Sequence, residues 1–485
     1  MSGEFGPPVA KKTVTTSFQR LTPTDLMFLR LETAEWPCHF GGLAIVDGTP
    51  LVDDAGQLRL PEIRDRLDRR LSQVPDMRQR VLFPGPLGGR PLWVDDDQFV
   101  IDNHLHQAAV EPPGGDRELL ETATRVYEQV LDRSRPLWEM WFLTGLSDDR
   151  VGVLLKLHHS MADGLAAVSM MGTLFDTEPD APEPAQVARA PQPPPKSRQL
   201  AADNLSATVR ASLRTLAKLA HPIRLARQTR AFVRMTRRYF GARAAPASSI
   251  NAPVQRGRRV GVLRLDLETM REAAHGHGGK INDVVLALWA GGLRHLLTSR
   301  GEKVAGVELI TGIAATLRSD TEAGAIDNQV GTLVLPLPVS ESDVNSRLDL
   351  IVHTTRRVKG EQRPGATMSY LAGLAATPVG RYFTSHQRST NVIATNVTGP
   401  PVPVYLLGAR VLEVLPIIEL IGNIGLTLCA FSYAGQMSMV VTADATSFPD
   451  LELLIEGMRQ DWHSLAEEEL KHARGELAPG AAEPR

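Results

Sequence analysis

A long proline-rich stretch divides the chain and limits the folds it can adopt. Residues 176–197 read DTEPDAPEPAQVARAPQPPPKS. Such a run cannot form a packed core, because proline lacks a backbone donor and fixes φ. We expect a linker there and a folded half on each side, which suits a chain of 485 residues. The expected boundaries are a flexible tail at 1–18, a first domain at 19–178, the linker with basic helices at 179–248, a second domain at 249–472 and a flexible tail at 473–485.

Both halves alternate between strand-like and helix-like patterns, which predicts an α/β (α+β) fold. In the first half we expect strands at 39–48 and 150–157, a helix at 117–132 whose apolar face extends to Val130 and Leu131, and a helix at 165–175. In the second half we expect strands at 259–267, 307–317 and 329–339 and helices at 281–297 and 450–470.

Residues 198–243 are strongly basic, although the whole chain has a formal net charge of −2. Many Arg and Lys side chains, from Arg210 to Arg243, are opposed by a single acid, Asp203. Their spacing of three and four places many on one side of a helix. The near-zero net charge argues against nucleic acid as a partner. Two interpretations stay open: a solvated surface packed on the domains, or a peripheral contact with anionic lipid headgroups.

The sequence shows no pattern typical of a secreted or membrane-spanning protein. Its two cysteines, Cys38 and Cys429, fit a reducing compartment, and the first residues contain no apolar signal region. The longest uncharged run, 420–443, is long enough to span a bilayer but is interrupted by Gly and polar residues. We expect it to form two strands around an Ala-Gly-Gln turn, in a cytoplasmic protein.

The sequence LHHSMADGLAAV, residues 157–168, is the main candidate for chemistry. Side chains alternate along a strand, so His158 and His159 are expected to point in opposite directions, which argues against one shared metal. One imidazole can then take a proton from a hydroxyl while the other supports it. Asp163 can fix the turn that follows, and Gly164 permits backbone angles that other residues resist. The alternative is a pair of core histidines at a strand end.

Two common catalytic motifs are missing from the sequence. There is no G-x-S-x-G elbow, so a serine nucleophile is not supported. The stretch HGHGGKIN, residues 275–282, resembles a phosphate loop, but Ala274 stands where the first glycine is required. Direct transfer to a deprotonated acceptor is therefore the simplest chemistry for the histidine pair.

The histidine motif resembles that of a known superfamily. H-H-x-x-x-D-G is typical of CoA-dependent acyltransferases, which include chloramphenicol acetyltransferase and peptide-synthetase condensation domains. Other stretches resemble the bacterial wax ester synthase/diacylglycerol acyltransferase family: LTPTDLMFLRLE followed by HFGGLAIVDG, RPLWEMWFLTGL, INDVVLA and TNVTGP. These motifs lie in order over residues 20–178 and 249–470, and together they are specific.

The resemblance implies two chloramphenicol-acetyltransferase-like domains with the active-site tunnel at their interface. It implies that His159 is the general base that deprotonates the acceptor hydroxyl, and that His158 and Asp163 support the site geometry. No metal or cofactor is implied, because acyl-CoA is a substrate. The resemblance gives a site-shaping role to Gly164, Pro136, Leu137, Trp138, Asn282, Asp283, Asn396, Gly399 and Pro400.

Several of these residues also have a purely structural interpretation. Trp138 could be a core tryptophan at the start of a strand. Asn282 and Asp283 could cap a helix, and residues 396–400 could form a turn.

The sequence departs from the family pattern in two places. Thr395 and Thr398 stand where Ser and Pro are usual, and GIAATLRSD at 312–320 differs from Val-Pro-Val-Ser-Leu-Arg while keeping Leu317 and Arg318. Both departures affect local shape and acceptor choice, and neither removes the expected base.

The implied function is transfer of a long acyl chain from acyl-CoA to diacylglycerol, or to a long-chain alcohol to give a wax ester. An amide-forming condensation is disfavoured because no carrier attachment motif is present. A non-catalytic lipid-binding or lipid-droplet protein is disfavoured by the intact histidine motif. The expected location is the cytoplasm, with peripheral contact to the inner membrane or lipid droplets through 198–243.

Overall fold

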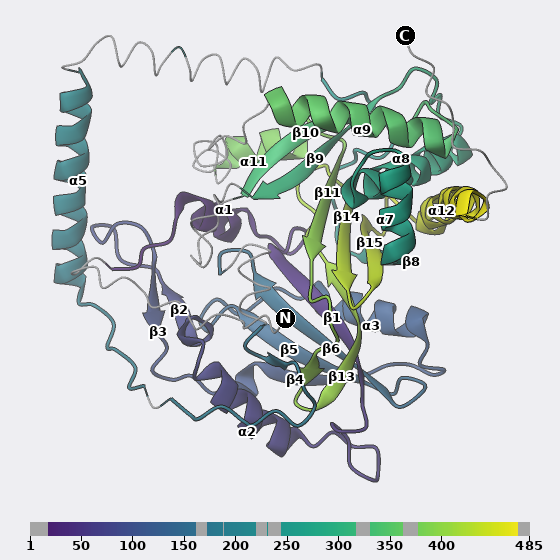
Figure 1. The fold of residues 1–485 in the computed structure, drawn as a ribbon. Coiled ribbons are helices and arrows are strands. Elements are labelled where there is room, and N and C mark those ends of the chain that lie inside the picture. The colour runs from purple at the N-terminus through teal and green to yellow at the C-terminus, as the bar shows by residue number, and fades with distance from the viewer. Residues whose placement is uncertain are drawn as a thin grey trace.

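The chain folds around two mixed sheets. The computed structural model describes residues 18–161, 172–187, 189–219, 230, 244–316, 330–361 and 377–473. In these residues, helices lie against both sheets and a separate two-stranded hairpin projects from the first half (Figure 1). The strand order is β4-β5-β6-β1-β13-β12-β7 in the first sheet and β10-β9-β11-β14-β15-β8 in the second. The predicted mixed α/β class is confirmed.

The first sheet is covered on both faces. Leu67 of α2 (Leu60–Leu71) shares a buried cluster with Val153, and Leu119 of α3 (Asp116–Tyr127) shares another with Leu154. Val153 and Leu154 are neighbours on one strand, so their side chains point to opposite faces. The strands are β1 (His39–Asp47), β4 (Leu105–Ala109), β5 (Trp138–Thr144), β6 (Arg150–His158), β7 (Phe175–Asp176), β12 (Tyr405–Leu406) and β13 (Ala409–Ile417).

The second sheet carries the largest buried cluster of the described residues. Side chains of α7 (Leu267–Gly276), α8 (Ile281–Ser299), α9 (Val344–Glu361) and α12 (Leu451–Ala473) pack in this cluster with those of the strands. The strands are β8 (Arg258–Asp266), β9 (Leu309–Thr316), β10 (Val330–Leu337), β11 (Val392–Thr398), β14 (Leu426–Tyr433) and β15 (Gln436–Asp444).

The uncharged run at 420–443 forms the predicted hairpin. Strands β14 and β15 pair antiparallel, and Ala434 and Gly435 make the turn with φ of 45° and 87°. Every residue of β14 is buried, which explains the lack of charge. Among the described residues, no helix is long and apolar enough to cross a membrane.

One segment of the second half joins the sheet of the first half. After β11 the chain leaves the second sheet, forms β12 and β13 in the first sheet, and returns as β14. Strand β1 therefore lies between β6, with His39 opposite His158, and β13, with Gly41 opposite Ile417. This exchange brings residues that follow β13 next to the end of β6.

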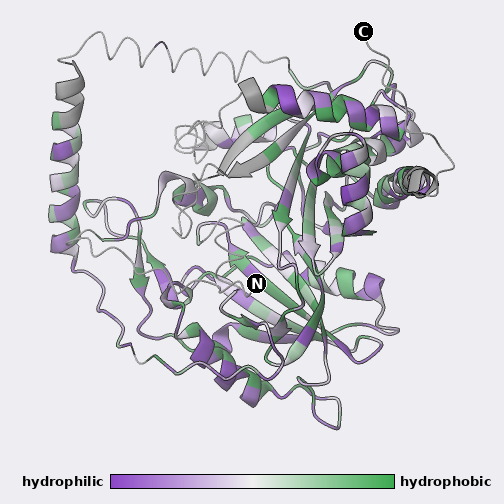
Figure 2. Cartoon of the chain, in the orientation of Figure 1, coloured by the Kyte–Doolittle hydropathy of each residue, from purple (hydrophilic) through white to green (hydrophobic). Residues whose placement is uncertain are grey.

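The proline-rich segment runs along the first half as an extended strap. Buried Arg70 of α2 forms ion pairs with Asp176 at 2.7 Å and with Glu183 at 3.2 Å. Helix α5 (Ser197–Leu219) follows and contacts the hairpin of β2 (Gln79–Leu82) and β3 (Leu92–Asp95), where Leu200 packs on Leu92. Hydrophobic residues concentrate in the sheets, whereas hydrophilic and hydrophobic positions alternate along α5 (Figure 2).

The structure differs from the sequence prediction at two helices and leaves several predicted segments outside its range, among them residues 1–17 and 474–485 of the expected tails. Helix α3 ends at Tyr127, so Val130 and Leu131 do not extend its face, and Val130 is exposed. Residues 162–171, 220–229 and 231–243 lie outside the described residues, so most of the expected helix at 165–175 and the later basic helices do too. The described end of the expected helix at 165–175 is not helical, because residues 172–174 form a turn and Phe175 belongs to β7. The remaining elements are α1 (Pro23–Leu31), η1 (Pro75–Arg78), η2 (Ile101–Asn103) and α11 (Pro378–Ser385).

Candidate active site

Backbone hydrogen bonds from two neighbouring strands fix the histidine pair. The amide N–H of His158 donates to the carbonyl of Leu137 at 3.0 Å, just before β5. The amide of His159 donates to the carbonyl of Cys38 at 2.9 Å, just before β1. The pair thus sits where β6 ends, held from both sides.

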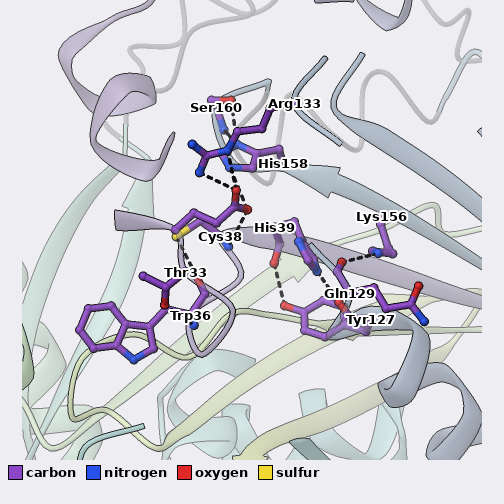
Figure 3. Close-up of polar contacts among 11 residues, drawn as sticks. Thr33, Trp36, Cys38, His39, Tyr127, Gln129, Arg133, Lys156, His158 and Ser160 are labelled. Atoms are coloured by element: carbon purple, nitrogen blue, oxygen red, sulfur yellow. Dashed lines mark hydrogen bonds and ion pairs between the residues drawn. The ribbon is translucent and has the colours of Figure 1, made fainter. Parts of the chain in front are cut away.

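His158 is fully buried and neutral. Its Nδ1 accepts the Ser160 amide N–H at 3.0 Å and lies 2.7 Å from the Ser160 hydroxyl (Figure 3). Because an amide can only donate, the ring proton is on Nε2, which lies 3.3 Å from Oε1 of Glu32. Burial lowers the pKa of His158, although the Glu32 carboxylate opposes that effect. His158 is therefore neutral, and the ring nitrogen that carries its proton lies in contact with the Glu32 carboxylate.

Glu32 is a buried anion at the end of α1. Its Oε2 accepts from Nε and Nη2 of Arg133 at 3.0 and 2.7 Å, and Oε1 accepts the Cys38 amide at 3.4 Å. Burial tends to raise the pKa of Glu32, but His158 and Arg133 outweigh it and lower the pKa to about 2. The resulting chain of contacts, Arg133–Glu32–His158–Ser160, locks the first histidine.

His159 has a different environment and remains accessible. Its ring stacks on Phe28 at 4.2 Å between centroids and 9° between planes, and meets the edge of Phe40 at 5.3 Å. Its Nε2 lies 3.3 Å from Oε1 of Glu419. The His159 side chain is 17% exposed, whereas that of His158 is 0% exposed. Of the two imidazoles, only that of His159 can meet a molecule from outside.

Glu419 comes from the second half of the sequence and is also an anion. It lies two residues beyond β13, and its side chain is 17% exposed. Burial tends to raise its pKa, but the His159 imidazole outweighs it, so the pKa of Glu419 is lowered. Each histidine thus faces its own carboxylate, and the two side chains lie in different surroundings. The accessible imidazole, that of His159 beside Glu419, can accept a proton from a hydroxyl.

Leu137 and Trp138 lie next to the histidine pair, with different roles. Leu137 is buried and its carbonyl holds the His158 backbone. Trp138 is buried, donates its indole N–H to the Met77 carbonyl at 2.7 Å, and stacks on His104 at 4.5 Å. Pro136 accepts the Trp138 amide at 2.9 Å. These contacts make Trp138 a core residue that supports the start of β5.

Asn282 and Asp283 lie in the first turn of α8. Asp283 is buried, and its Oδ2 accepts the amide N–H of the N-cap residue Lys280 at 2.8 Å. The contacts of Asp283 are those of a helix cap. Within the described residues, neither Asn282 nor Asp283 forms a hydrogen bond or ion pair with the histidine pair.

Residues 396–400 guide the chain out of the second sheet. Asn396 pairs with Ala430 in β14, and the Gly399 amide donates to Ser432 at 2.9 Å. A Cβ at Gly399 would lie 2.4 Å from the Phe431 ring, so only glycine fits there. The Pro400 carbonyl accepts the Ala434 amide at 3.0 Å. After this turn the chain forms β12 and β13 in the first sheet and then reaches Glu419.

Two expected site residues cannot be placed. Asp163 and Gly164 of the motif lie outside the described residues, as do Leu317 and Arg318.

Three residues of the site were missed from the sequence. Glu32 lies inside the motif at 21–32, and its position after an apolar helix was a usable signal. Arg133 and Glu419 lie in unremarkable stretches far along the chain, and no local pattern identifies them.

Comparison with known proteins identifies the family of the chain. Residues 21–285 match the wax ester synthase/diacylglycerol acyltransferase catalytic domain, and residues 326–466 match the C-terminal domain of the same family. Two probable diacylglycerol O-acyltransferases of Mycobacterium tuberculosis are 29% and 28% identical. The first match covers 90% of this chain and 94% of the relative, and the second covers 90% and 96%.

Solved structures share the fold over nearly the whole chain. The wax ester synthase/diacylglycerol acyltransferase from Marinobacter aquaeolei VT8 superposes with a TM-score of 0.67 at 22% identity, covering 94% of this chain and 100% of that one. A starter condensation domain of rhizomide synthetase, solved with C8-CoA, gives a TM-score of 0.55 at 13% identity, covering 94% and 95%. The two-domain fold implied by the motifs is thus confirmed. The chain belongs to the wax ester synthase/diacylglycerol acyltransferase family of acyltransferases.

Proposed function

We propose that this protein transfers a long acyl chain from acyl-CoA to the free hydroxyl of diacylglycerol, with His159 as general base. The observation that carries the proposal is the asymmetry of the histidine pair. His158 is sealed by Glu32 and Ser160, whereas His159 is part-exposed, ring-stacked and next to an anion. That is the arrangement expected of one supporting and one acting imidazole.

The reaction needs no covalent enzyme intermediate. The neutral imidazole of His159 takes the proton of the acceptor hydroxyl, and the oxygen attacks the thioester carbonyl carbon. The tetrahedral intermediate collapses as the new C–O bond remains and the C–S bond breaks. The leaving thiolate takes the proton back from the imidazolium, which gives an ester and free CoA.

The supporting residues act through geometry. We assign to His158 and Asp163 the task of holding His159 in place, His158 through its contacts with Glu32 and Ser160. Gly164, the Pro136–Trp138 element, Asn282, Asp283 and the 396–400 turn would shape the tunnel between the two sheets.

The choice of substrates rests on relatives. The donor class is supported by the family match and by the C8-CoA complex of a protein with the same fold. Diacylglycerol is our first choice of acceptor because the Mycobacterium tuberculosis relatives carry that activity in their names. A long-chain alcohol is the second choice, supported by the Marinobacter aquaeolei structure.

Amide-forming condensation is a second candidate function. It is favoured only by the shared fold of the condensation domain, whose TM-score is lower than that of the wax ester synthase/diacylglycerol acyltransferase.

Helix α5 supports a place of action at a lipid surface. Leu205, Val209 and Leu213 recur every four residues and are all exposed, so they form one apolar stripe. Arg210 and the basic residues that follow along the chain favour anionic headgroups. Changing the three stripe residues to Ser should lower binding to anionic vesicles at low salt, and unchanged binding would contradict this placement.

The test of the function is release of free CoA from palmitoyl-CoA. The purified protein is given diacylglycerol, hexadecanol or a primary amine of the same chain length, each alone. Release that rises with diacylglycerol or hexadecanol supports O-acyl transfer and ranks the two acceptors. Release only with the amine would favour condensation, and acyl-CoA binding without release would favour a lipid-binding protein.

A further inference from the structure

We propose that Glu419 is a positioning residue for His159: its carboxylate orients the ring and stabilises the imidazolium formed when the acceptor proton is taken. This inference rests on the proposed function, in which His159 is the base. Neither the histidine motif nor the other family motifs in the sequence include Glu419.

The topology explains why Glu419 reaches the histidine. Strand β1 pairs with β6 on one side, with His39 opposite His158, and with β13 on the other, with Gly41 opposite Ile417. The residues that follow His158 and Ile417 therefore emerge at the same end of β1. Glu419 approaches from that side, and its Oε1 lies 3.3 Å from Nε2 of His159.

Of the two carboxylates near the histidine pair, Glu419 is the one that contacts the His159 ring. Glu32 is committed to Arg133 and to neutral His158, so its charge is already compensated. Four charges lie close enough to the buried Cys38 to change the pKa of its thiol. Glu32 and Glu419 raise this pKa, whereas Arg133 and Arg381 of α11 lower it. Glu419 itself touches the His159 ring and remains an anion, which favours the protonated ring over the neutral one.

The ring stacking restricts what else Glu419 could do. Phe28 covers one face of the imidazole and Phe40 meets it edge-on, so the ring plane is set by packing. The Glu419 carboxylate at Nε2 then fixes the orientation of the His159 ring within that plane. A buried acid plays the same two parts for the histidine of serine hydrolases, where it holds the tautomer and stabilises the imidazolium.

The kinetic test replaces the charge and keeps the shape. Glu419→Gln should lower kcat for acyl transfer by about 10²-fold, within the range that general base catalysis supplies. KM for acyl-CoA should change far less, and Glu419→Asp should recover part of the loss. The matched control is Glu413→Gln on β13, since Glu413 pairs with Arg264 and Ser438 away from the histidine. If Glu419→Gln has the same kcat as the control Glu413→Gln, the inference is overturned.

A second readout does not depend on the substrate. In ¹⁵N-histidine spectra, His159 is assigned by its loss in His159→Ala and titrated from pH 5 to 9. We expect the ring to become protonated at a pH lower by about one unit in Glu419→Gln than in the wild type, a tenfold loss in proton affinity. Glu413→Gln should titrate as the wild type does. Identical titrations of Glu419→Gln and wild type would overturn the role of Glu419, whereas absent CoA release with a shifted titration would overturn only the proposed reaction.

Discussion

The buried carboxylate of Glu32 predicts a specific pH dependence of stability. Its pKa falls from the ordinary value of 4.5 to about 2 in the folded chain. A pKa lowered that far corresponds to about 3 kcal/mol of unfolding free energy. The sign follows from the direction: this stabilisation is complete above about pH 5 and is lost as the pH falls toward 2. At pH 3 about half of it should remain.

The perturbation is Glu32→Gln, which keeps the shape and removes the charge. At pH 7 the variant should be less stable than the wild type by about 3 kcal/mol, the lower end of the cost of breaking a buried pair. The lower end applies because Arg133 is 39% exposed and can be solvated when its partner is lost. The difference should shrink as the pH falls.

The assay is urea unfolding followed by tryptophan fluorescence at pH 7, 5, 4 and 3. The control is Glu35→Gln, because Glu35 lies three residues after Glu32 and pairs with exposed Arg256. An exposed pair of that kind contributes less than about 1 kcal/mol. A difference between Glu32→Gln and wild type that stays constant across the pH range would contradict a charged, buried Glu32.

Three further substitutions test the packing around the site. Gly399→Ala should cost about 1–3 kcal/mol of unfolding free energy, since its Cβ would collide with the Phe431 ring, and an unchanged urea midpoint would contradict that collision. Arg70→Met should cost about 1–3 kcal/mol, because Asp176 and Glu183 lose this guanidinium while Glu183 keeps Arg66, and should speed proteolysis within the proline-rich strap; a strap cleaved at the wild-type rate would show that Arg70 does not anchor it. Phe28→Leu should lower kcat by up to about tenfold, since an aromatic contact contributes about 0.5–1.5 kcal/mol, and a wild-type kcat would show that stacking does not orient the base.

Local patterns were enough to predict most elements but not their partners. The short apolar runs at 39–48 and 150–157 predict strands, and both form, because such runs suit strands that are buried on both faces. The same kind of local pattern cannot say that β13 pairs with β1 rather than with its neighbours in sequence. Strand pairing between residues as far apart as Gly41 and Ile417 depends on the whole fold.

The candidate site was predictable in part for the same reason. His158 and His159 are adjacent, so alternation alone indicates that they face different surroundings. The carboxylates that they face come from distant parts of the sequence. Glu32 follows α1 near the start of the chain, and Glu419 follows β13 in the second half. Charged residues are mostly exposed, so nothing local marks Glu419 as a buried partner, and Glu32 is indicated only by its place after an apolar helix.

The most direct test of the proposed reaction follows the acyl chain itself. Palmitoyl-CoA labelled in the acyl group is incubated with diacylglycerol and either the wild type or His159→Ala, and the labelled lipids are separated and counted. We predict labelled triacylglycerol from the wild type in equal amount to the CoA released, and a rate about 10²- to 10⁴-fold lower in the variant. Triacylglycerol formed by His159→Ala at the wild-type rate would contradict the assignment of His159 as the base.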